Sequence, residues 1–449
     1  MNLLVVAALG VLALVLLVMW GKVSAFLSLL LVSIAVGVAS GMPLSGIMGS
    51  IEKGMGGTLG FIATVIGLGA LIGEILERSG GAQQLAMTMV RKFGDENASW
   101  AVGLVAFIFG LAIFFDVGFI VLIPLVHSIA LRTKKSTLFY AIPLLASLAV
   151  THAFIPPHPG PVAVADVLGA SMGQVMMYGF LAGLPTAIIA GPIFGRFIGK
   201  KFFLKVPDWV KEDGAEMDES KLPNFWLVLS VILLPIVLIL FGAYANMVAK
   251  HLTAAKQAVP YGWQFVQLIG HPFAALICGI ILSFITLGFA RGLTKQDLLK
   301  LSNKALGPTG GMILVIGAGG VFKQILVDSK IGDMLAKSLG TLGWSPLVLA
   351  FVMAALIRIA QGSATVAMMT TAGFIAPVLK AFPGTSPGWT VIAIAAGATI
   401  LSHVNDAGFW LVKQYLDTDE ATTFKTWTVM ETLIALVGFG FVLLFSSFI

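Results

Sequence analysis

Apolar segments long enough to cross a lipid bilayer recur along almost the whole chain. A transmembrane helix needs about 20 consecutive apolar residues, and such runs lie at 2–20, 24–40, 57–76, 225–248, 265–290 and 421–449. The polar stretches between them are short, so we expect no separate soluble domain. The pattern predicts an all-α polytopic membrane protein.

Composition supports this prediction. The 449-residue chain is 58% hydrophobic and 11% charged, whereas a soluble domain carries about a quarter charged residues. The first apolar run lacks a basic leader and a small-residue cleavage site, so we expect a retained helix rather than a signal peptide. The only cysteine, Cys278, has no partner for an internal disulfide.

Charge and missing motifs exclude several functions. The net charge of +6 resides in the polar connections, where basic residues report membrane orientation rather than a nucleic-acid partner. No GxxxxGK[ST] motif is present, so ATP hydrolysis on this chain is not expected to drive transport. Neither HExxH nor Gly-x-Gly-Asp occurs, and we expect no metal and no cofactor.

The second half of the chain contains a weak repeat of the first. Residues 57–86 align with 307–336 at an offset of 250, and about a third of the aligned positions are identical. Thr58 and Thr309 occupy Gly-rich segments of the two copies, where we expect them to cap helix N-termini and treat them as second-tier site candidates. We therefore predict two halves at 1–206 and 225–449, joined by a cytoplasmic loop at 207–224.

Loop charges indicate how the two halves are oriented, because cytoplasmic loops collect Lys and Arg. The basic connections at 132–135, 200–205 and 291–304 all face the cytoplasm under one arrangement of the first half. In it, residues 101–131 form a re-entrant hairpin, and 139–171 form a transmembrane helix broken at its prolines. The weakly charged stretch 41–54 then lies outside while its counterpart 291–304 lies inside, which makes the repeats inverted.

The second half is expected to mirror this arrangement. It would contain a hairpin at 346–380 with its tip at 361–365, and a broken helix at 389–412 interrupted at 402–406. Inverted repeats whose broken helices meet at the midplane are typical of secondary transporters.

Polar residues gather at these four interruptions, although polar groups in hydrocarbon cost several kcal/mol each unless they are buried in protein or line a wet cavity. Broken helices expose backbone N–H groups at the positive end of the helix dipole, which suits an anion. Arg358 could pair with a substrate carboxylate, or it could neutralise a structural acid. The candidate substrate-binding residues are Asp116, His158, Arg358, Gln361, Ser363, Thr365, Ser402, Asn405 and Asp406.

Proton coupling requires a group that changes charge when the substrate binds, and a carboxyl in a closing cavity can do so near neutral pH. The candidates are Asp116, Asp406, His152 and His403. Other roles are open: the two acids could cap helices, the histidines could be satisfied core residues, and Ser363 and Thr365 could serve helix packing.

Several stretches resemble the gluconate permease family of bacterial proton symporters, within the ion transporter superfamily. The similar motifs cover most of the chain and are GGTLG (56–60), FFDVGF (114–119), PPHPGP (156–161), IGAGG (316–320), FKQ (322–324), GSATVA (362–367) and SHVNDAGFW (402–410). In one departure, the acid at the position of Asp116 is more often Glu in the family. The resemblance implies a homodimer with a scaffold and a moving transport domain, and import of gluconate or a related sugar acid with protons.

We therefore predict an elevator-type symporter in the bacterial inner membrane, with a sugar-acid anion, protons and the lipid bilayer as its partners. Glycerate, idonate, fructuronate or D-serine as substrate, and sodium as coupling ion, are the near alternatives. A passive channel is a remote one. So is an intramembrane enzyme, with Asp116 and Asp406 as paired acids or His152 and His158 as metal ligands.

Overall fold

The computed structural model describes residues 3–94, 96–207, 222–331, 334, 345–403 and 406–448, and these form helices and connections without a β-strand. The first half contains α1 (Leu3–Met19), α2 (Ala25–Ala39), α3 (Leu44–Arg78), α4 (Gly81–Phe93), α5 (Ala98–Gly110), α6 (Phe115–Thr133), α7 (Leu138–Phe154), α8 (Pro159–Leu168), α9 (Met172–Ile188), the π-helical turn η1 (Ile189–Ile193) and α10 (Phe194–Lys201). The second half contains α12 (Phe225–Ala254), α13 (Tyr261–Ile269), α14 (Pro272–Ser283), η3 (Phe284–Gly288), η4 (Phe289–Arg291), α15 (Lys295–Asp328), α17 (Pro346–Gln361), α18 (Ala364–Ala381), α19 (Pro387–Gly397), α20 (Ala407–Leu416), α21 (Glu420–Thr423), η5 (Phe424–Thr428) and α22 (Val429–Ser446).

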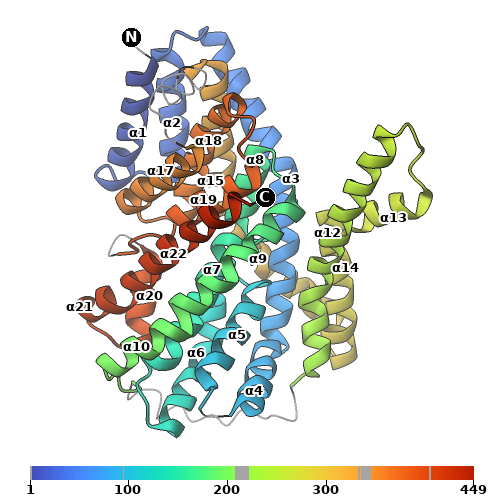
Figure 1. Ribbon diagram of the computed structural model, residues 1–449, viewed down its shortest axis with the longest axis vertical. Coiled ribbons are helices and arrows are strands. Elements are labelled where there is room, and N and C mark those ends of the chain that lie inside the picture. Colours follow the sequence, from blue (N-terminus) through green and yellow to red (C-terminus); the bar gives the residue numbers. More distant parts are fainter. Residues whose placement is uncertain are drawn as a thin grey trace.

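Eight helical segments among the described residues are long and apolar enough to cross a bilayer. This confirms the predicted all-α polytopic membrane protein. Four apolar helices are shorter, namely α2, α5, α17 and α19. Helices α12 and α14 stand beside the main bundle with α13 at one end, and α1 and α2 lie at the opposite side (Figure 1).

The order of helices recurs along the chain. Helices α3, α5, α6, α7 and α8 each have a counterpart about 250 residues later, in α15, α17, α18, α19 and α20. The two sets pack together at the centre of the molecule, where α8 contacts both α18 and α19. Of the predicted connecting loop at 207–224, residues 208–221 lie outside the described residues.

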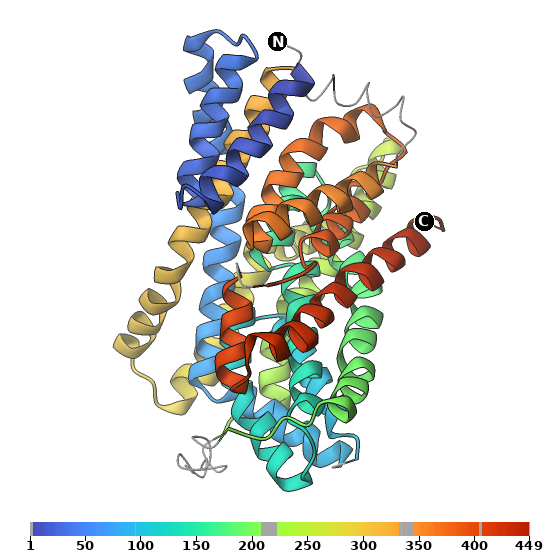
Figure 2. The same cartoon turned by 90° about the vertical axis from the view of Figure 1, so that its left-hand side faces the viewer.

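Helices α3 and α15 form the most extensive helix pair and run side by side (Figure 2). Small residues allow their backbones to approach closely. A Cβ atom added to Gly54 would lie 2.7 Å from the carbonyl oxygen of Gly320, and one added to Gly320 would overlap the hydroxyl of Thr58. Gly54 and Gly320 therefore allow α3 and α15 to contact each other closely.

This contact corrects two predictions. Thr58 and Thr309 lie inside α3 and α15 and cap neither helix, because glycines in these membrane helices serve packing and do not mark helix starts. Thr294 caps α15, where its hydroxyl accepts from the amide of Asp297 at 3.2 Å. The stretches 41–54 and 291–304 are also mostly the first turns of these helices, with only short non-helical connections before Leu44 and Lys295.

Candidate functional site

The turn between α17 and α18 is built by Gly362 and Ser363. Gly362 adopts a left-handed conformation with φ of 82°, which ends α17 and which residues with a Cβ rarely adopt. Ser363 then begins α18, because its side-chain oxygen accepts from the amide of Val366 at 3.3 Å. The N-terminal amides of α18 therefore point toward the turn.

Asp406 starts the helix after the second interruption. Helix α19 ends at Gly397, and α20 begins at Ala407, with Asp406 accepting from the amide of Gly408 at 3.1 Å. Of the predicted site residues in this connection, Asn405 lies outside the described residues.

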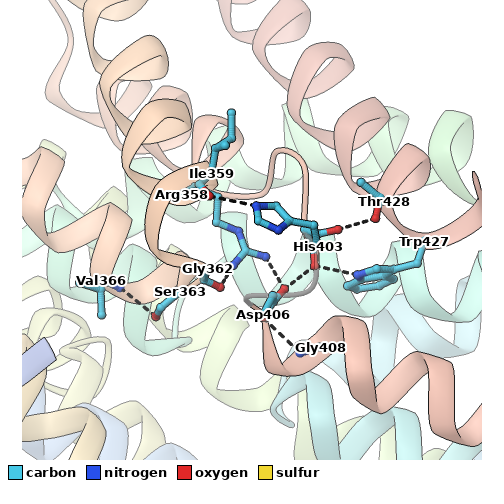
Figure 3. Close-up of polar contacts among 11 residues, drawn as sticks. Arg358, Ile359, Gly362, Ser363, Val366, His403, Asp406, Gly408, Trp427 and Thr428 are labelled. Carbon is cyan, nitrogen blue, oxygen red and sulfur yellow. Dashed lines mark hydrogen bonds and ion pairs between the residues drawn. The ribbon is translucent and has the colours of Figure 1, made fainter. Parts of the chain in front are cut away.

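A buried ion pair joins these two interruptions (Figure 3). Nη2 of Arg358 lies 2.5 Å from Oδ2 of Asp406, and the two side chains are 4% and 16% exposed. Arg358 also donates through Nη1 to the carbonyl oxygen of Gly362. Ser402 donates its hydroxyl to Oδ2 of Asp406 and accepts from Nε1 of Trp427 at 2.7 Å. We call Arg358, Ser402, Asp406 and Trp427 the arginine cluster.

Two further hydrogen bonds fix the connection before α20. A ring nitrogen of His403 donates to the carbonyl oxygen of Ile359 on α17 at 3.0 Å. The hydroxyl of Thr428 donates to the carbonyl oxygen of Ser402 at 2.5 Å. His403 and Asp406, both predicted proton carriers, thus hold the break to α17, and Ser402 holds it to η5.

The first half places two histidines at its own interruptions, the half-buried His152 and the buried His158. His152 lies in the last turn of α7 and His158 caps α8, and their ring centroids are 4.9 Å apart. His158 donates through Nε2 to the carbonyl oxygen of Gly110, where α5 ends. The ring of Phe114 lies 6.3 Å from His152 and 6.1 Å from His158. We call His152 and His158 the histidine pair.

Asp116 connects the two halves of the site. It occupies the first turn of α6 and is exposed in the single chain. Its carboxylate is close enough to that of Asp406 for the two charges to repel. The preceding Phe115 packs on Trp427 with ring centroids 5.4 Å apart. Asp116 therefore lies at the edge of the arginine cluster.

The remaining predicted residues lie either next to the α17–α18 turn or away from the helix breaks. Thr365 lies in the first turn of α18, half-buried and two residues after Ser363. Gln361 ends α17, and its side chain lies outside what the structure describes. Thr58 belongs to the contact of α3 with α15 and not to the helix breaks.

Sequence reasoning missed Glu431. This acid lies in α22 and is 4% exposed, and its charge interacts with those of Arg358 and Asp406. Among the described residues, its Oε1 finds no hydrogen-bond partner. The signal was present, because an ionisable residue inside the apolar run 421–449 is by default a functional candidate.

A cavity of about 700 Å³ lies elsewhere, between α8, α9 and the α12–α14 group. Its walls include Asp166, Asn246 and His271, and no member of the arginine cluster lines it. We place the candidate site at the helix breaks, because buried charges and exposed helix termini meet there. In the part of the chain that is described, no three His, Cys, Asp or Glu side chains gather as metal ligands.

Spanning helices, interrupted helices and a buried charged cluster at their meeting point define a polytopic membrane transporter. Residues 1–448 match the family described as GntP family permease. The chain belongs to this family, which confirms the predicted resemblance and makes the protein a transporter and not an enzyme.

Named relatives cover nearly the entire chain. It is 42% identical to a gluconate permease of Pseudomonas aeruginosa over 445 residues, covering 98% of this chain and 96% of the relative. It is 42% identical to a gluconate permease of Bacillus subtilis, covering 99% of each. The Gnt-II system L-idonate transporter of Escherichia coli is 37% identical, covering 97% of each.

Two solved transporters share the fold at low identity. The YdaH transporter of Alcanivorax borkumensis superposes with a TM-score of 0.66 at 16% identity, covering 94% of this chain and 98% of that one. MtrF of Neisseria gonorrhoeae gives a TM-score of 0.64 at 16% identity, covering 89% and 83%.

Proposed function

We propose that this protein imports gluconate or a closely related sugar acid together with protons across the bacterial cytoplasmic membrane. The observation that carries the proposal is the buried pair of Arg358 and Asp406 at the meeting point of the helix breaks. The relatives' names, gluconate permease and L-idonate transporter, supply the substrate class.

The chemistry of the site suits a polyhydroxylated carboxylate. Arg358 has a buried Nε–H that lacks a hydrogen-bond partner among the described residues, so one donor of its guanidinium is free for an anion. The N-termini of α8, α18 and α20 add partial positive charge at the breaks. Ser363 and Thr365 are half-buried hydroxyls that can exchange hydrogen bonds with a sugar chain.

Substrate contacts from the remaining predicted residues belong to the same proposal. We assign contact roles to Gln361 and Asn405 at the second-half breaks, and to Asp116 and His158 at those of the first half. Ser402 acts by holding Asp406. Idonate, glycerate, fructuronate and D-serine are the competing substrates, and competition against labelled gluconate separates them.

For the working cycle we propose an elevator motion in a homodimer. The two halves, 1–206 and 225–449, would be inverted repeats. The hairpins and broken helices would form the moving transport domain, and the long outer helices the scaffold. The recurrence of α3–α8 as α15–α20 supports the duplication. Cross-linking of cysteines placed on the α18 turn and on α3 would detect the motion.

Purified protein in proteoliposomes tests the function. Under an inward proton gradient, labelled gluconate should accumulate above its outside concentration, and a protonophore should abolish the accumulation. Replacing sodium with choline should leave uptake unchanged. Uptake that requires sodium would contradict the proposal that protons are the coupling ion. The absence of gradient-driven uptake for every sugar acid tried would overturn the proposed function itself.

A further inference from the structure

Glu431 is a buried acid next to a charge pair that it does not join. Its side chain is 4% exposed in the interior of the continuous helix formed by α21, η5 and α22. Asp406 accepts from Arg358, Ser402 and the amide of Gly408. By contrast, Oε1 of Glu431 has no hydrogen-bond partner in the described part of the chain.

The cation whose charge acts on Glu431 is Arg358, and Arg358 is already paired with Asp406. Helices α19, α9 and α7 pack against α22. The titratable side chains on these elements and on η5 are Tyr140 and His152 of α7, Tyr178 of α9 and Lys425 of η5. The charges that act on Glu431 are those of Arg358 and Asp406.

Counting charges shows what an anionic substrate meets here. Arg358 supplies one positive charge, whereas Asp406 and Glu431 supply two negative charges when both are ionised. The ionised cluster therefore already carries excess negative charge before a carboxylate arrives. Burying a further anion beside it is costly, because like charges repel strongly in a low-dielectric site. A proton on Glu431 removes the excess.

We propose that Glu431 carries the transported proton. The step rests on the proposed import of a sugar acid with protons. A proton from the outside water binds the carboxylate of Glu431 as the sugar acid binds beside Arg358, and it leaves to the inside water when the anion leaves. Because coupling between two ligands is reciprocal, the proton strengthens anion binding as much as the anion strengthens proton binding.

This assignment separates three jobs among the acids of the site. Asp406 holds Arg358 in place and also accepts from the hydroxyl of Ser402. Asp116 is exposed in the single chain and lies at the edge of the arginine cluster. Glu431 is the acid whose change of charge the cluster can use, since its neutral form needs no cation.

The test compares Glu431→Gln with Glu420→Gln in proteoliposomes. Glu420 begins the same continuous helix, but its side chain is 52% exposed and lies 3.4 Å from Lys413. Two activities are measured with labelled gluconate: accumulation under an inward proton gradient, and counterflow against unlabelled internal gluconate without a gradient. Counterflow needs binding and movement of the loaded carrier but no net proton transfer.

We expect Glu431→Gln to abolish accumulation and to keep counterflow within about threefold of wild type. For wild-type protein, the gluconate concentration that gives half-maximal counterflow should rise by up to about tenfold per pH unit as the pH increases, because one proton is linked to binding. In Glu431→Gln this dependence should vanish. Glu420→Gln should behave like wild type, and Glu431→Asp should restore part of the accumulation.

Two results would overturn the assignment. Accumulation by Glu431→Gln with wild-type pH dependence would place the proton on another group. Loss of counterflow together with accumulation in Glu431→Gln, at normal membrane abundance, would assign Glu431 to binding or structure. If wild-type protein itself shows no proton-driven accumulation, the failure belongs to the proposed function and not to Glu431.

Discussion

The helix breaks of the two halves occupy corresponding places in the chain, but they are built from different chemistry. In the second half, Arg358 and Asp406 form a buried ion pair with hydroxyl and indole partners. In the first half, His152 and His158 face each other beside an aromatic ring, and His158 donates to a backbone carbonyl. The break in the second half contains a charged pair, whereas the break in the first half is packed with histidine and phenylalanine rings.

We interpret this difference as a division of roles between the two proposed repeats. A buried ion pair gains little stability over apolar packing, so its retention in one half only is best explained by a ligand that needs a cation there. In the first half, His158 donates to the carbonyl oxygen of Gly110 and so fixes the end of α5 beside its proposed substrate contact. In this interpretation the second half recognises the charge of the substrate, and the first half contributes mainly to the shape of the site.

Among the substitutions at the two breaks, removal of the Arg358 cation should reduce gluconate uptake the most. Arg358→Gln leaves Asp406 buried without its partner, and such a loss costs about 3–5 kcal/mol. We expect gluconate uptake to fall by more than about 100-fold. Lys413→Gln, which breaks the exposed pair with Glu420, should stay within about twofold.

Membrane abundance, measured by quantitative immunoblot, separates folding from binding in these variants. The double substitution Arg358→Gln with Asp406→Asn removes both charges of the ion pair, so it should recover abundance but not uptake. Uptake near wild type in Arg358→Gln would move anion recognition away from the arginine cluster.

A smaller effect is expected from the turn that presents Arg358. Gly362→Ala forces a side chain into the left-handed conformation, which costs about 1–2 kcal/mol, and its carbonyl oxygen is an acceptor for Arg358. We expect a lower unfolding temperature and counterflow reduced by about tenfold. In the matched control Gly440→Ala in α22, the new methyl group meets open space. Equal behaviour of both variants would argue against a strained turn.

The histidine pair should give the smallest change. His158→Gln exchanges one hydrogen bond to Gly110 for another of similar reach, and a typical hydrogen bond contributes about 1 kcal/mol. Counterflow should fall by less than about fivefold, with its pH dependence intact. If counterflow by His158→Gln did not depend on pH, the proton carrier would lie in the first half, and the two breaks would not differ as described.

The helix interruptions were visible in the sequence because prolines, glycines and polar residues interrupt apolar runs. Gly362, Pro159 and Asp406 sit where helices end or begin. The partner of Arg358 was not visible, since 48 residues separate it from Asp406 and no helical periodicity links them.

Two errors of sequence reasoning have physical causes. Thr58 was expected to cap a helix because Gly-rich stretches usually interrupt soluble helices, whereas here Gly54 and Gly320 let α3 and α15 touch. Glu431 was overlooked because its segment was read as one apolar run. The sequence alone does not show that its carboxyl turns toward Arg358.

The glycine contact between α3 and α15 has a consequence for biosynthesis. Gly54 leaves the ribosome long before Gly320, and at about 5–20 residues per second the interval is on the order of 10 to 50 s. Throughout that interval the surface of α3 around Gly54 lacks its partner helix α15, so lipid or the insertion machinery must cover it. The newly synthesised first half must therefore remain stable in the membrane, without its α15 contact, until the second half has been inserted.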